Sequence, residues 1–317
     1  MLREAPGTWS THVSDQYMVG KVPSGGYVAS LVLNCVVEEL QHAATEPPLP
    51  HLKFAPSATH TDVFSANIHY MSSTLPGPAT CHVEIIKTGK TTTSCEASMY
   101  QQNKETMRCL VTCGNLLLAR TKGPNLSKLS VDDAPPALPP LNECIRVDAG
   151  DNTPASVRSR VHCFVPSQTA AQYKGSRATK EDGSFDEETL LHRKQAIQTT
   201  HGADYSGYMM YAKEEMGHPT ASPTLKDAPI FLDAGVPPIL GAYVTGWVPT
   251  LNLTFQFINH PASNNHGVFR FRFKTSRVSG GFLVEDGELW DMNDDNLIAV
   301  SRQRAMVGVS QVSKGKL

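Results

Sequence analysis

The sequence has 317 residues, of which 40% are hydrophobic and 18% are charged. This composition supports a packed core and excludes global disorder, and the length suits two domains better than one. A formal net charge of −2 gives no electrostatic footprint for nucleic acid, and no apolar run is long enough to cross a membrane as a helix. We therefore expect a soluble two-domain protein that binds neither nucleic acid nor a membrane.

The ends of the chain and its cysteines bear on localisation. The first seven residues contain no apolar core of signal-peptide length, and the seven cysteines are scattered and odd in number, which does not suggest a disulfide framework. The sequence ends in Gly-Lys-Leu, an imperfect version of the peroxisomal Ser-Lys-Leu signal. We expect a cytoplasmic protein, with the peroxisome as the alternative.

The first predicted element is a helix that follows Ser24, a residue type favoured at helix N-caps. Residues 27–37 are apolar apart from two positions on one side, which predicts a helix buried on nearly all sides. The glycines Gly25 and Gly26 come immediately before this run. They would let another backbone or a ligand approach the start of the helix closely.

Four strands are predicted after this helix, at residues 63–71, 81–87, 91–100 and 107–118. Turn residues separate them, which indicates a meander of antiparallel strands. A proline-rich segment, residues 124–154, follows and is typical of a connection between domains. A charged stretch from Glu187 to Thr199 is compatible with a helix.

The pattern of the first half then recurs. An apolar segment at 227–243 takes the place of the helix, and strands are predicted at 251–258, 268–274, 282–290 and 297–307. This recurrence predicts an N-terminal domain at 1–123, a linker at 124–154 and a C-terminal domain at 155–317. Each domain should be a helix wrapped by a curved antiparallel sheet, and the two sheets should pair edge to edge because each otherwise leaves an unpaired edge.

Three polar residues of the second half stand in apolar surroundings. Strand alternation turns Gln303 inward between the outward Arg302 and Arg304. Thr250 begins the strand at 250–257 and is expected on the same face as Asn252. Each position also has a structural interpretation, either as a hydrogen-bonded bridge between strands or as a feature of a strand start.

Asp233 is the only charged residue among a dozen apolar or small ones. The flanking prolines and the preference of Asp for helix N-caps predict that it caps a helix at its start. A partly desolvated carboxylate in such a place can also hold or activate a water molecule.

Several short motifs together identify a resemblance to a known family. In the first half they are Gly25-Gly26-Tyr27-Val28-Ala29 and Val83-Glu84-Ile85-Ile86-Lys87-Thr88-Gly89-Lys90. In the second half they are Leu232-Asp233, Pro237-Pro238, Gly246-Trp247-Val248-Pro249-Thr250-Leu251, Gly280-Gly281-Phe282, Gly287-Glu288-Leu289-Trp290-Asp291 and Ser301-Arg302-Gln303. In order and spacing the chain resembles the type II acyl-CoA thioesterases and the wider thioesterase-like superfamily. The resemblance implies an α+β fold of two fused hotdog domains, a double hotdog.

The resemblance also implies a catalytic site. In such thioesterases an Asp, a Thr and a Gln hold the attacking water, and these fall on Asp233, Thr250 and Gln303. Substrate contacts are expected at two glycine-rich segments, namely Gly25, Gly26 and Tyr27, and Gly280 and Gly281. Backbone N–H groups at the helix start, with Gly25-Gly26 as the candidate, would polarise the thioester carbonyl. The mechanism needs no metal and no cofactor.

We therefore expect a hydrolase that cleaves an acyl thioester carried by coenzyme A or by an acyl carrier protein, in lipid or polyketide metabolism. A non-hydrolytic tailoring enzyme that cyclises, dehydrates or releases a polyketide-like chain is one alternative, since fold does not decide chemistry. A degenerate acyl-binding protein is another. The resembling family also suggests a homodimer.

Overall fold

The computed structural model describes residues 1–117, 134–146, 160–169, 203–211, 224–234 and 248–306, apart from small gaps at 20, 48–49, 53–54, 168, 264 and 266. The charged stretch at 187–199 and most of the predicted linker lie outside these residues. The motif residues from Pro237 to Trp247 lie outside them as well.

The first half contains helix α1 (Gly25–Ala43) and strands β1 (Leu2–Ala5), β2 (Thr8–Val13), β5 (Asp62–Tyr70), β6 (Gly77–Thr88), β7 (Thr93–Gln101) and β8 (Lys104–Gly114). A short pair, β3 (Met18–Val19) and β4 (Val22–Pro23), precedes α1. The second half contains helix α6 (Ala228–Ala234) and strands β9 (Cys144–Arg146), β10 (Val161–Pro166), β11 (Ala203–Tyr211), β12 (Thr250–Phe257), β13 (Val268–Ser279), β14 (Phe282–Asp291) and β15 (Leu297–Met306). All four predicted strands of each half are therefore confirmed.

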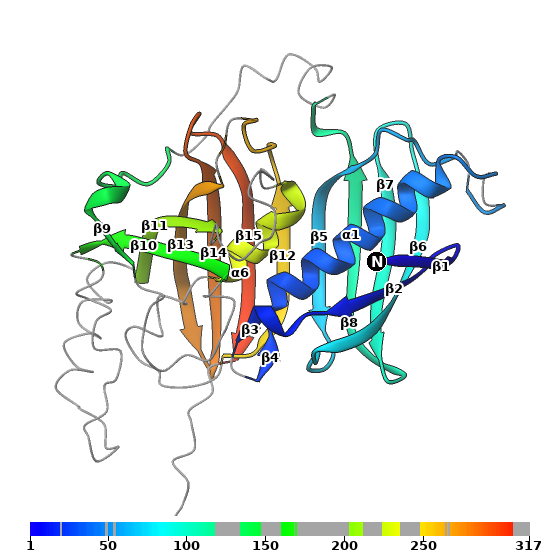
Figure 1. Ribbon diagram of the computed structural model, residues 1–317, viewed down its shortest axis with the longest axis horizontal. Coiled ribbons are helices and arrows are strands. Elements are labelled where there is room, and N and C mark those ends of the chain that lie inside the picture. Colours follow the sequence, from blue (N-terminus) through cyan, green and yellow to red (C-terminus); the bar gives the residue numbers. More distant parts are fainter. Residues whose placement is uncertain are drawn as a thin grey trace, which may run out of the picture.

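The strands form one continuous antiparallel sheet in the order β1-β2-β6-β7-β8-β5-β12-β15-β14-β13-β11-β10-β9. Helices α1 and α6 lie on the same side of it (Figure 1). The two halves join where β5 pairs with β12, with Ile68 opposite Leu253. This confirms the predicted edge-to-edge pairing. Strand β9 lies inside the predicted linker but pairs with β10 at the far edge of the second half.

Helix α1 follows the physical expectation from its sequence. The Ser24 side chain accepts a hydrogen bond from the Tyr27 N–H, as an N-cap residue should. Residues such as Val32, Leu33 and Val36 are almost completely buried, because the sheet covers one side of the helix and α6 packs against its start. Helix α1 is thus the core of the first half and reaches the second half at its N-terminus.

The repeat predicted from sequence also appears in irregularities of the sheet. The β5–β8 ladder shifts register directly after Val63, and the β12–β15 ladder does so directly after Thr250. The β6–β7 ladder shifts after Ile85, and the β13–β14 ladder after Thr275. Since β-bulges mark defined positions of a fold, they fix which residues of the two halves correspond.

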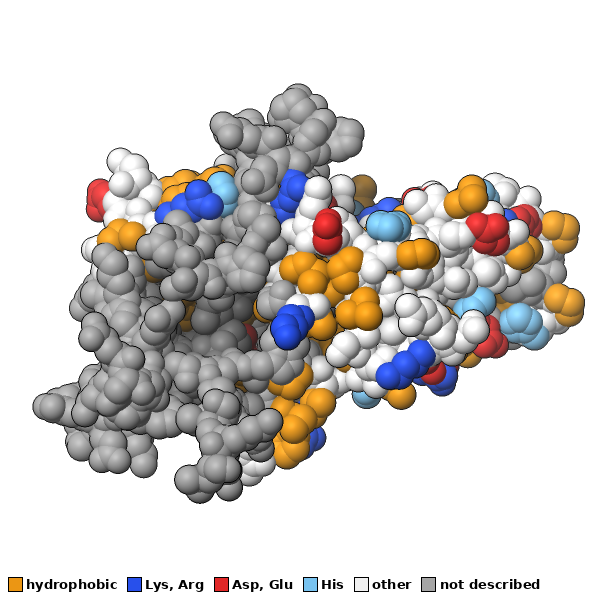
Figure 2. All heavy atoms as spheres, turned by 60° about the horizontal axis from the view of Figure 1, so that its bottom comes forward, with side chains coloured by type: hydrophobic (Ala, Val, Ile, Leu, Met, Phe, Trp, Pro, Cys, Tyr) orange, Lys and Arg blue, Asp and Glu red, His pale blue; other side chains and the backbone are white. Residues whose placement is uncertain are grey.

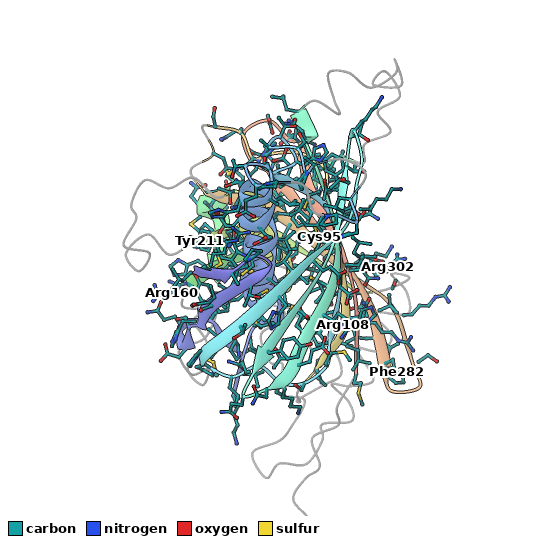
Figure 3. The ribbon with its side chains drawn as sticks, turned by 90° about the vertical axis from the view of Figure 1, so that its right-hand side faces the viewer. Cys95, Arg108, Arg160, Tyr211, Phe282 and Arg302 are labelled. Carbon is teal, nitrogen blue, oxygen red and sulfur yellow. The ribbon has the colours of Figure 1, made fainter. Side chains whose placement is uncertain are left out.

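The outer face of the sheet carries charged side chains. Arg108 and Arg302 are exposed on the side away from α1 (Figure 3). Arg302 pairs with Asp286. Among the described side chains on the face shown in Figure 2, both charges are scattered and do not form a patch of one sign. Within the described part of the chain, no helix is long and apolar enough to span a membrane.

Candidate active site

Gln303 and Thr250 meet on the inner face of the second half of the sheet. Gln303 is 9% exposed, and its side-chain amide nitrogen donates a hydrogen bond to the Thr250 hydroxyl. Gln303 lies between Arg302 and Arg304, which are both exposed, so the predicted alternation is confirmed. The structural interpretation of Gln303 as a bridge between strands and its functional interpretation are therefore compatible.

The prediction that Thr250 shares a face with Asn252 is wrong. Thr250 lies opposite the buried Ala305, whereas Asn252 lies opposite the exposed Arg304. The register shift between Thr250 and Asn252 is a β-bulge, and the extra residue reverses the alternation. The bulge turns the Thr250 hydroxyl to the inner face, where it reaches Gln303.

Asp233 lies near the end of α6 and not at its start, so the predicted N-cap role in its own helix is also wrong. Its carboxylate instead meets the start of α1. The Asp233 Oδ2 atom accepts hydrogen bonds from the Gly26 N–H and from the Ser24 hydroxyl, each 2.8 Å long. The N-terminus of a helix carries unpaired N–H groups and partial positive charge, which stabilise a carboxylate. Asp233 thereby joins the two halves.

Close packing leaves no room for a side chain at Gly26, and at Gly25 a side chain would crowd the end of the Tyr70 side chain. A Cβ atom on Gly26 would lie 2.1 Å from the Pro229 carbonyl oxygen and 2.6 Å from the Asp233 Cβ. A Cβ atom on Gly25 would lie 2.8 Å from the Tyr70 hydroxyl oxygen. The sequence predicted that a backbone or a ligand approaches here, and the structure shows that the backbone of α6 does.

Electrostatics at Asp233 reflect two opposing effects. Burial raises the pKa of the carboxyl, while the hydrogen bonds from Gly26, Ser24 and Gly25 lower it. The net pKa is above the ordinary value for Asp, which makes the carboxylate a better proton acceptor than an exposed one.

Tyr27 and the second glycine pair have structural roles. The Tyr27 hydroxyl accepts a hydrogen bond from the Ser14 N–H, and its ring stacks on Tyr17. Gly280 and Gly281 form the turn between β13 and β14, and both have positive φ, which favours glycine. A Cβ at either glycine would have nothing within 4 Å. This backbone conformation accounts for both glycines without a ligand.

Sequence reasoning missed two polar residues beside Asp233. The Tyr70 hydroxyl is buried without a hydrogen-bond partner among the described residues, and so is the Glu285 Oε2 atom. The Asp233 carboxylate raises the pKa of both groups, after the larger effect of burial. Glu285 could have been found from the alternation of β14, which turns this acidic residue to the apolar side between Leu283 and Gly287.

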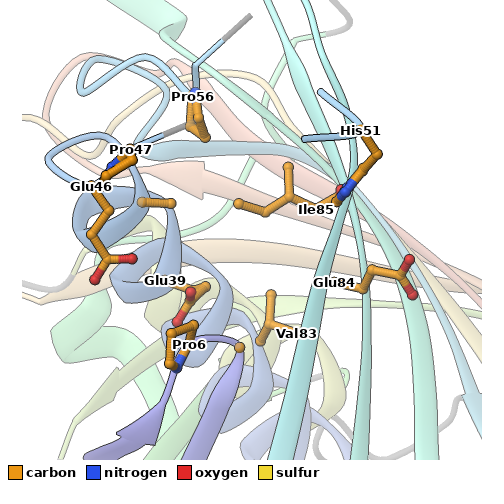
Figure 4. A pocket seen from close by; sticks show the side chains of 11 residues that line it. Pro6, Glu39, Glu46, Pro47, His51, Pro56, Val83, Glu84 and Ile85 are labelled. Atoms are coloured by element: carbon orange, nitrogen blue, oxygen red, sulfur yellow. The ribbon is translucent and has the colours of Figure 1, made fainter. Parts of the chain in front are cut away.

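A hollow also lies in the first half, between α1 and β6 (Figure 4). Its lining includes Glu39, whose carboxylate is already held by Trp9 and Arg3. Neither Asp233 nor Gln303 lines it. The candidate site is therefore the region where α6, the start of α1 and the inner face of the second half meet.

Two family descriptions match the chain. The acyl-CoA thioesterase N-terminal domain matches residues 13–114, and the acyl-CoA thioesterase C-terminal domain matches residues 165–307. Together they cover both halves in the order expected of a fused pair. No curated protein matches the chain in sequence.

Several solved structures have the same fold. A protein assigned as a thioesterase II from Thermobifida fusca YX has 21% identity and a TM-score of 0.71, over 97% of this chain and 94% of that chain. A hot dog fold protein of unknown function from Alicyclobacillus acidocaldarius has 13% identity and a TM-score of 0.66, over 95% and 93%. The acyl-CoA thioesterase II TesB2 of Mycobacterium marinum has 12% identity and a TM-score of 0.59, over 98% and 95%. These similarities confirm the predicted double hotdog.

Proposed function

The chain belongs to the acyl-CoA thioesterase family, and we propose that it hydrolyses an acyl-CoA thioester with a water molecule held by Asp233, Thr250 and Gln303. Thioester hydrolysis follows from the family. The observation that supports these three residues is their placement. Gln303 and Thr250 share a hydrogen bond, and Asp233 lies on α6, which packs on the strand that carries Gln303.

The proposed roles follow from the donors and acceptors of each group. The bond from the Gln303 nitrogen to Thr250 fixes the amide, so its oxygen is left to accept a hydrogen of the water. Thr250 keeps its own O–H to donate. Asp233 accepts the proton as the water oxygen attacks the thioester carbonyl carbon, and its raised pKa favours that transfer.

The carbonyl oxygen needs a hydrogen-bond donor as it gains negative charge. The expected donors were N–H groups at the start of α1, but the Gly26 N–H already donates to Asp233. The Tyr70 hydroxyl lies beside Gly25 and has no partner among the described residues. Burial keeps its pKa well above the ordinary value, so the group stays a donor. We propose that the Tyr70 hydroxyl donates a hydrogen bond to the carbonyl oxygen of the thioester.

The variant Asp233→Asn tests the proposal, because it retains the shape of the side chain and removes the base. A panel of acyl-CoA and acyl-carrier-protein thioesters of different chain lengths is incubated with each protein, and free thiol is measured. The wild type should hydrolyse acyl-CoA, and the variant should be slower by roughly 10²–10⁴-fold with little change in KM. A wild-type rate for Asp233→Asn refutes the base assignment. A wild type that hydrolyses nothing in the panel favours the non-hydrolytic or acyl-binding alternative.

Three further features stay proposals. We assign the substrate to coenzyme A first and to a carrier protein second, in lipid or polyketide metabolism. The proposed location is the cytoplasm, with the peroxisome as the alternative, and the proposed assembly is a homodimer. Imaging of the protein with and without its last three residues tests the location, and light scattering tests the assembly.

A further inference from the structure

Glu285 lies next to the proposed water site but is not one of the residues that we propose to hold the water. It lies on β14 directly opposite Gln303 on β15, and Thr275 on β13 lies opposite it on the other side. Directly opposed residues of antiparallel strands point to the same face of a sheet, so all three side chains project towards the helices. Helix α6, which carries Asp233, packs on β14 and β15.

The surroundings of Glu285 favour its protonated form. The residue is 4% exposed, and its Oε2 atom has no hydrogen-bond partner among the described residues. The charged groups that act on it there are both carboxylates, Asp233 on α6 and Asp286 on its own strand, while Gln303 and Thr275 are neutral. Burial and the charge of Asp233 raise its pKa to about 8.

Asp233 differs because it has donors. The Gly26 N–H and the Ser24 hydroxyl stabilise its ionised form, whereas Glu285 lacks a comparable set. Two interacting carboxyl groups with such different surroundings take up a single proton between them, and it resides on the group that is less stabilised as an anion. Asp233 is then the base of the pair, and Glu285 is the acid.

The first half of the molecule shows that the fold does not require an acid here. The bulges after Ile85 and Thr275 make these two residues equivalent, and Cys95 is paired with Ile85 as Glu285 is with Thr275. Cys95 is fully buried and packs as an apolar residue in the core. A buried carboxyl with one oxygen atom that lacks a hydrogen-bond partner among the described residues is unfavourable for folding, so a function of Glu285 explains it better than packing does.

From this placement we propose that Glu285 is a further catalytic residue, which donates its proton to the sulfur of the leaving thiol. The inference rests on the proposed hydrolysis. Water attacks the carbonyl carbon, a C–O bond forms, and one water proton passes to Asp233. When the tetrahedral intermediate collapses, the C–S bond breaks and its electron pair leaves on sulfur, which takes the Glu285 proton.

The products are a carboxylic acid and a free thiol, so the step balances with water as the other reactant. The enzyme is left with a protonated Asp233 and an ionised Glu285. Transfer of the proton from Asp233 to Glu285, the group with the higher affinity for it, restores the starting state. The pair therefore supplies both the base and the acid of one turnover.

The leaving group provides a direct test. Wild type and Glu285→Gln are compared on an acyl-CoA from the panel and on the phenylthio ester of the same acyl chain. An aryl thiolate is a much weaker base than the alkyl thiolate of coenzyme A and departs without a proton. We expect Glu285→Gln to lower kcat by roughly 10²-fold on acyl-CoA and by less than about fivefold on the phenylthio ester. The alkaline fall of the pH–rate profile on acyl-CoA, near pH 8 in the wild type, should disappear.

The controls separate the possible failures. Glu288→Gln makes the same chemical change on β14 at an outer-face residue paired with Arg272, and it should leave both rates within about twofold. Asp233→Asn should slow both substrates. If Glu285→Gln slows both substrates equally, or neither, the acid role is wrong while hydrolysis stands. If the wild type cleaves neither, the proposed hydrolysis itself fails.

Discussion

The two halves of the sheet share a backbone but differ in one small set of residues on the inner face. In the second half this set consists of Thr250, Gln303, Glu285 and Thr275. The bulges and strand pairings make Val63, Val111, Cys95 and Ile85 their respective equivalents in the first half. These four are buried among the apolar residues of the core.

The comparison separates what the fold needs from what the chemistry needs. The first half demonstrates that apolar side chains satisfy these positions, so the polar set in the second half is not required for packing. A buried polar group needs a hydrogen-bond partner to offset its loss of contact with water. Two atoms of this set, the Glu285 Oε2 and the Thr275 Oγ1, have no hydrogen-bond partner among the described residues. The second half thus carries a local cost in stability that the first half avoids.

The first half still contributes to the proposed site, through different elements. The start of α1 holds the Asp233 carboxylate, and the end of β5 carries Tyr70. Because β5 and β12 join the two halves, both contributions lie at the boundary between them. The proposed site is therefore composite.

The largest effect on stability is expected at Glu285. Its pKa is about 8 in the folded protein and 4.5 in the unfolded chain, so between these values only the folded state keeps the proton. Stability from this group is therefore fully present below about pH 4.5 and is lost as the pH rises to 8. The Glu285→Gln variant cannot lose a proton there, so it should gain up to roughly 5 kcal/mol relative to wild type between pH 4.5 and 8.5.

Urea unfolding of both proteins across this pH range measures the effect. Glu288→Gln, whose carboxylate is paired with Arg272, serves as the control and should show a nearly constant difference from wild type. A difference between Glu285→Gln and wild type that does not change with pH would mean that Glu285 is ionised throughout. In that case the difference between Glu285 and its equivalent Cys95 would not reflect a protonated, buried carboxyl in the second half.

The next effect comes from exchanging equivalent residues of the two halves. Val111→Gln places an amide in the fully buried core of the first half, where it is too large and has no assigned partner. It should lower the free energy of unfolding by about 2–5 kcal/mol and leave kcat nearly unchanged. Gln303→Val should show the opposite pattern, in which kcat falls strongly and the free energy of unfolding changes little.

Thermal unfolding and thioester turnover are measured for both variants. The two variants are informative together because each one introduces the residue that the other half carries at the equivalent position. If Gln303→Val destabilises the protein strongly but turns over substrate normally, Gln303 is a bridge between strands, as its structural interpretation holds. Equal activity losses in the two variants would show that the halves do not differ in function.

Much of this architecture could be predicted from the sequence, because hydrophobic periodicity and turn residues are local signals. The strands, the buried helix and the inward direction of Gln303 follow from them. The direction of Thr250 does not, because one bulge residue reverses strand alternation and bulges leave no clear local pattern. The family resemblance identified Thr250 as a site residue, although strand alternation had placed its side chain on the wrong face of the sheet.

The rest of the site depends on contacts between distant segments. Asp233 was expected to cap its own helix, but its carboxylate accepts a hydrogen bond from Gly26 at the start of α1, 207 residues earlier in the chain. Tyr70 is a normal residue at a strand end until the packing of its ring on Gly25 is known. Such partners are set by how the two halves dock, which no local pattern of a single sequence encodes.

The smallest predicted effect concerns Tyr70, the residue of the first half that we assign to the carbonyl oxygen. Tyr70→Phe removes one oxygen atom and keeps the ring that packs on Gly25. Because the hydroxyl has no partner among the described residues, its loss should leave stability unchanged or slightly raised. If it donates to the developing oxyanion, kcat should fall by roughly tenfold or more with little change in KM.

A merely structural hydroxyl predicts the opposite pattern, with lower stability and a normal kcat. Steady-state kinetics and thermal unfolding of the same preparations distinguish the two. Tyr100→Phe, a change at an outer strand residue of the same half, is the matched control and should alter neither quantity appreciably. If the Tyr70→Phe variant has the wild-type kcat, Tyr70 is not catalytic, and the start of α1 is the only part of the first half that we still assign to the site. The boundary between the halves would then stabilise the base without acting on the carbonyl.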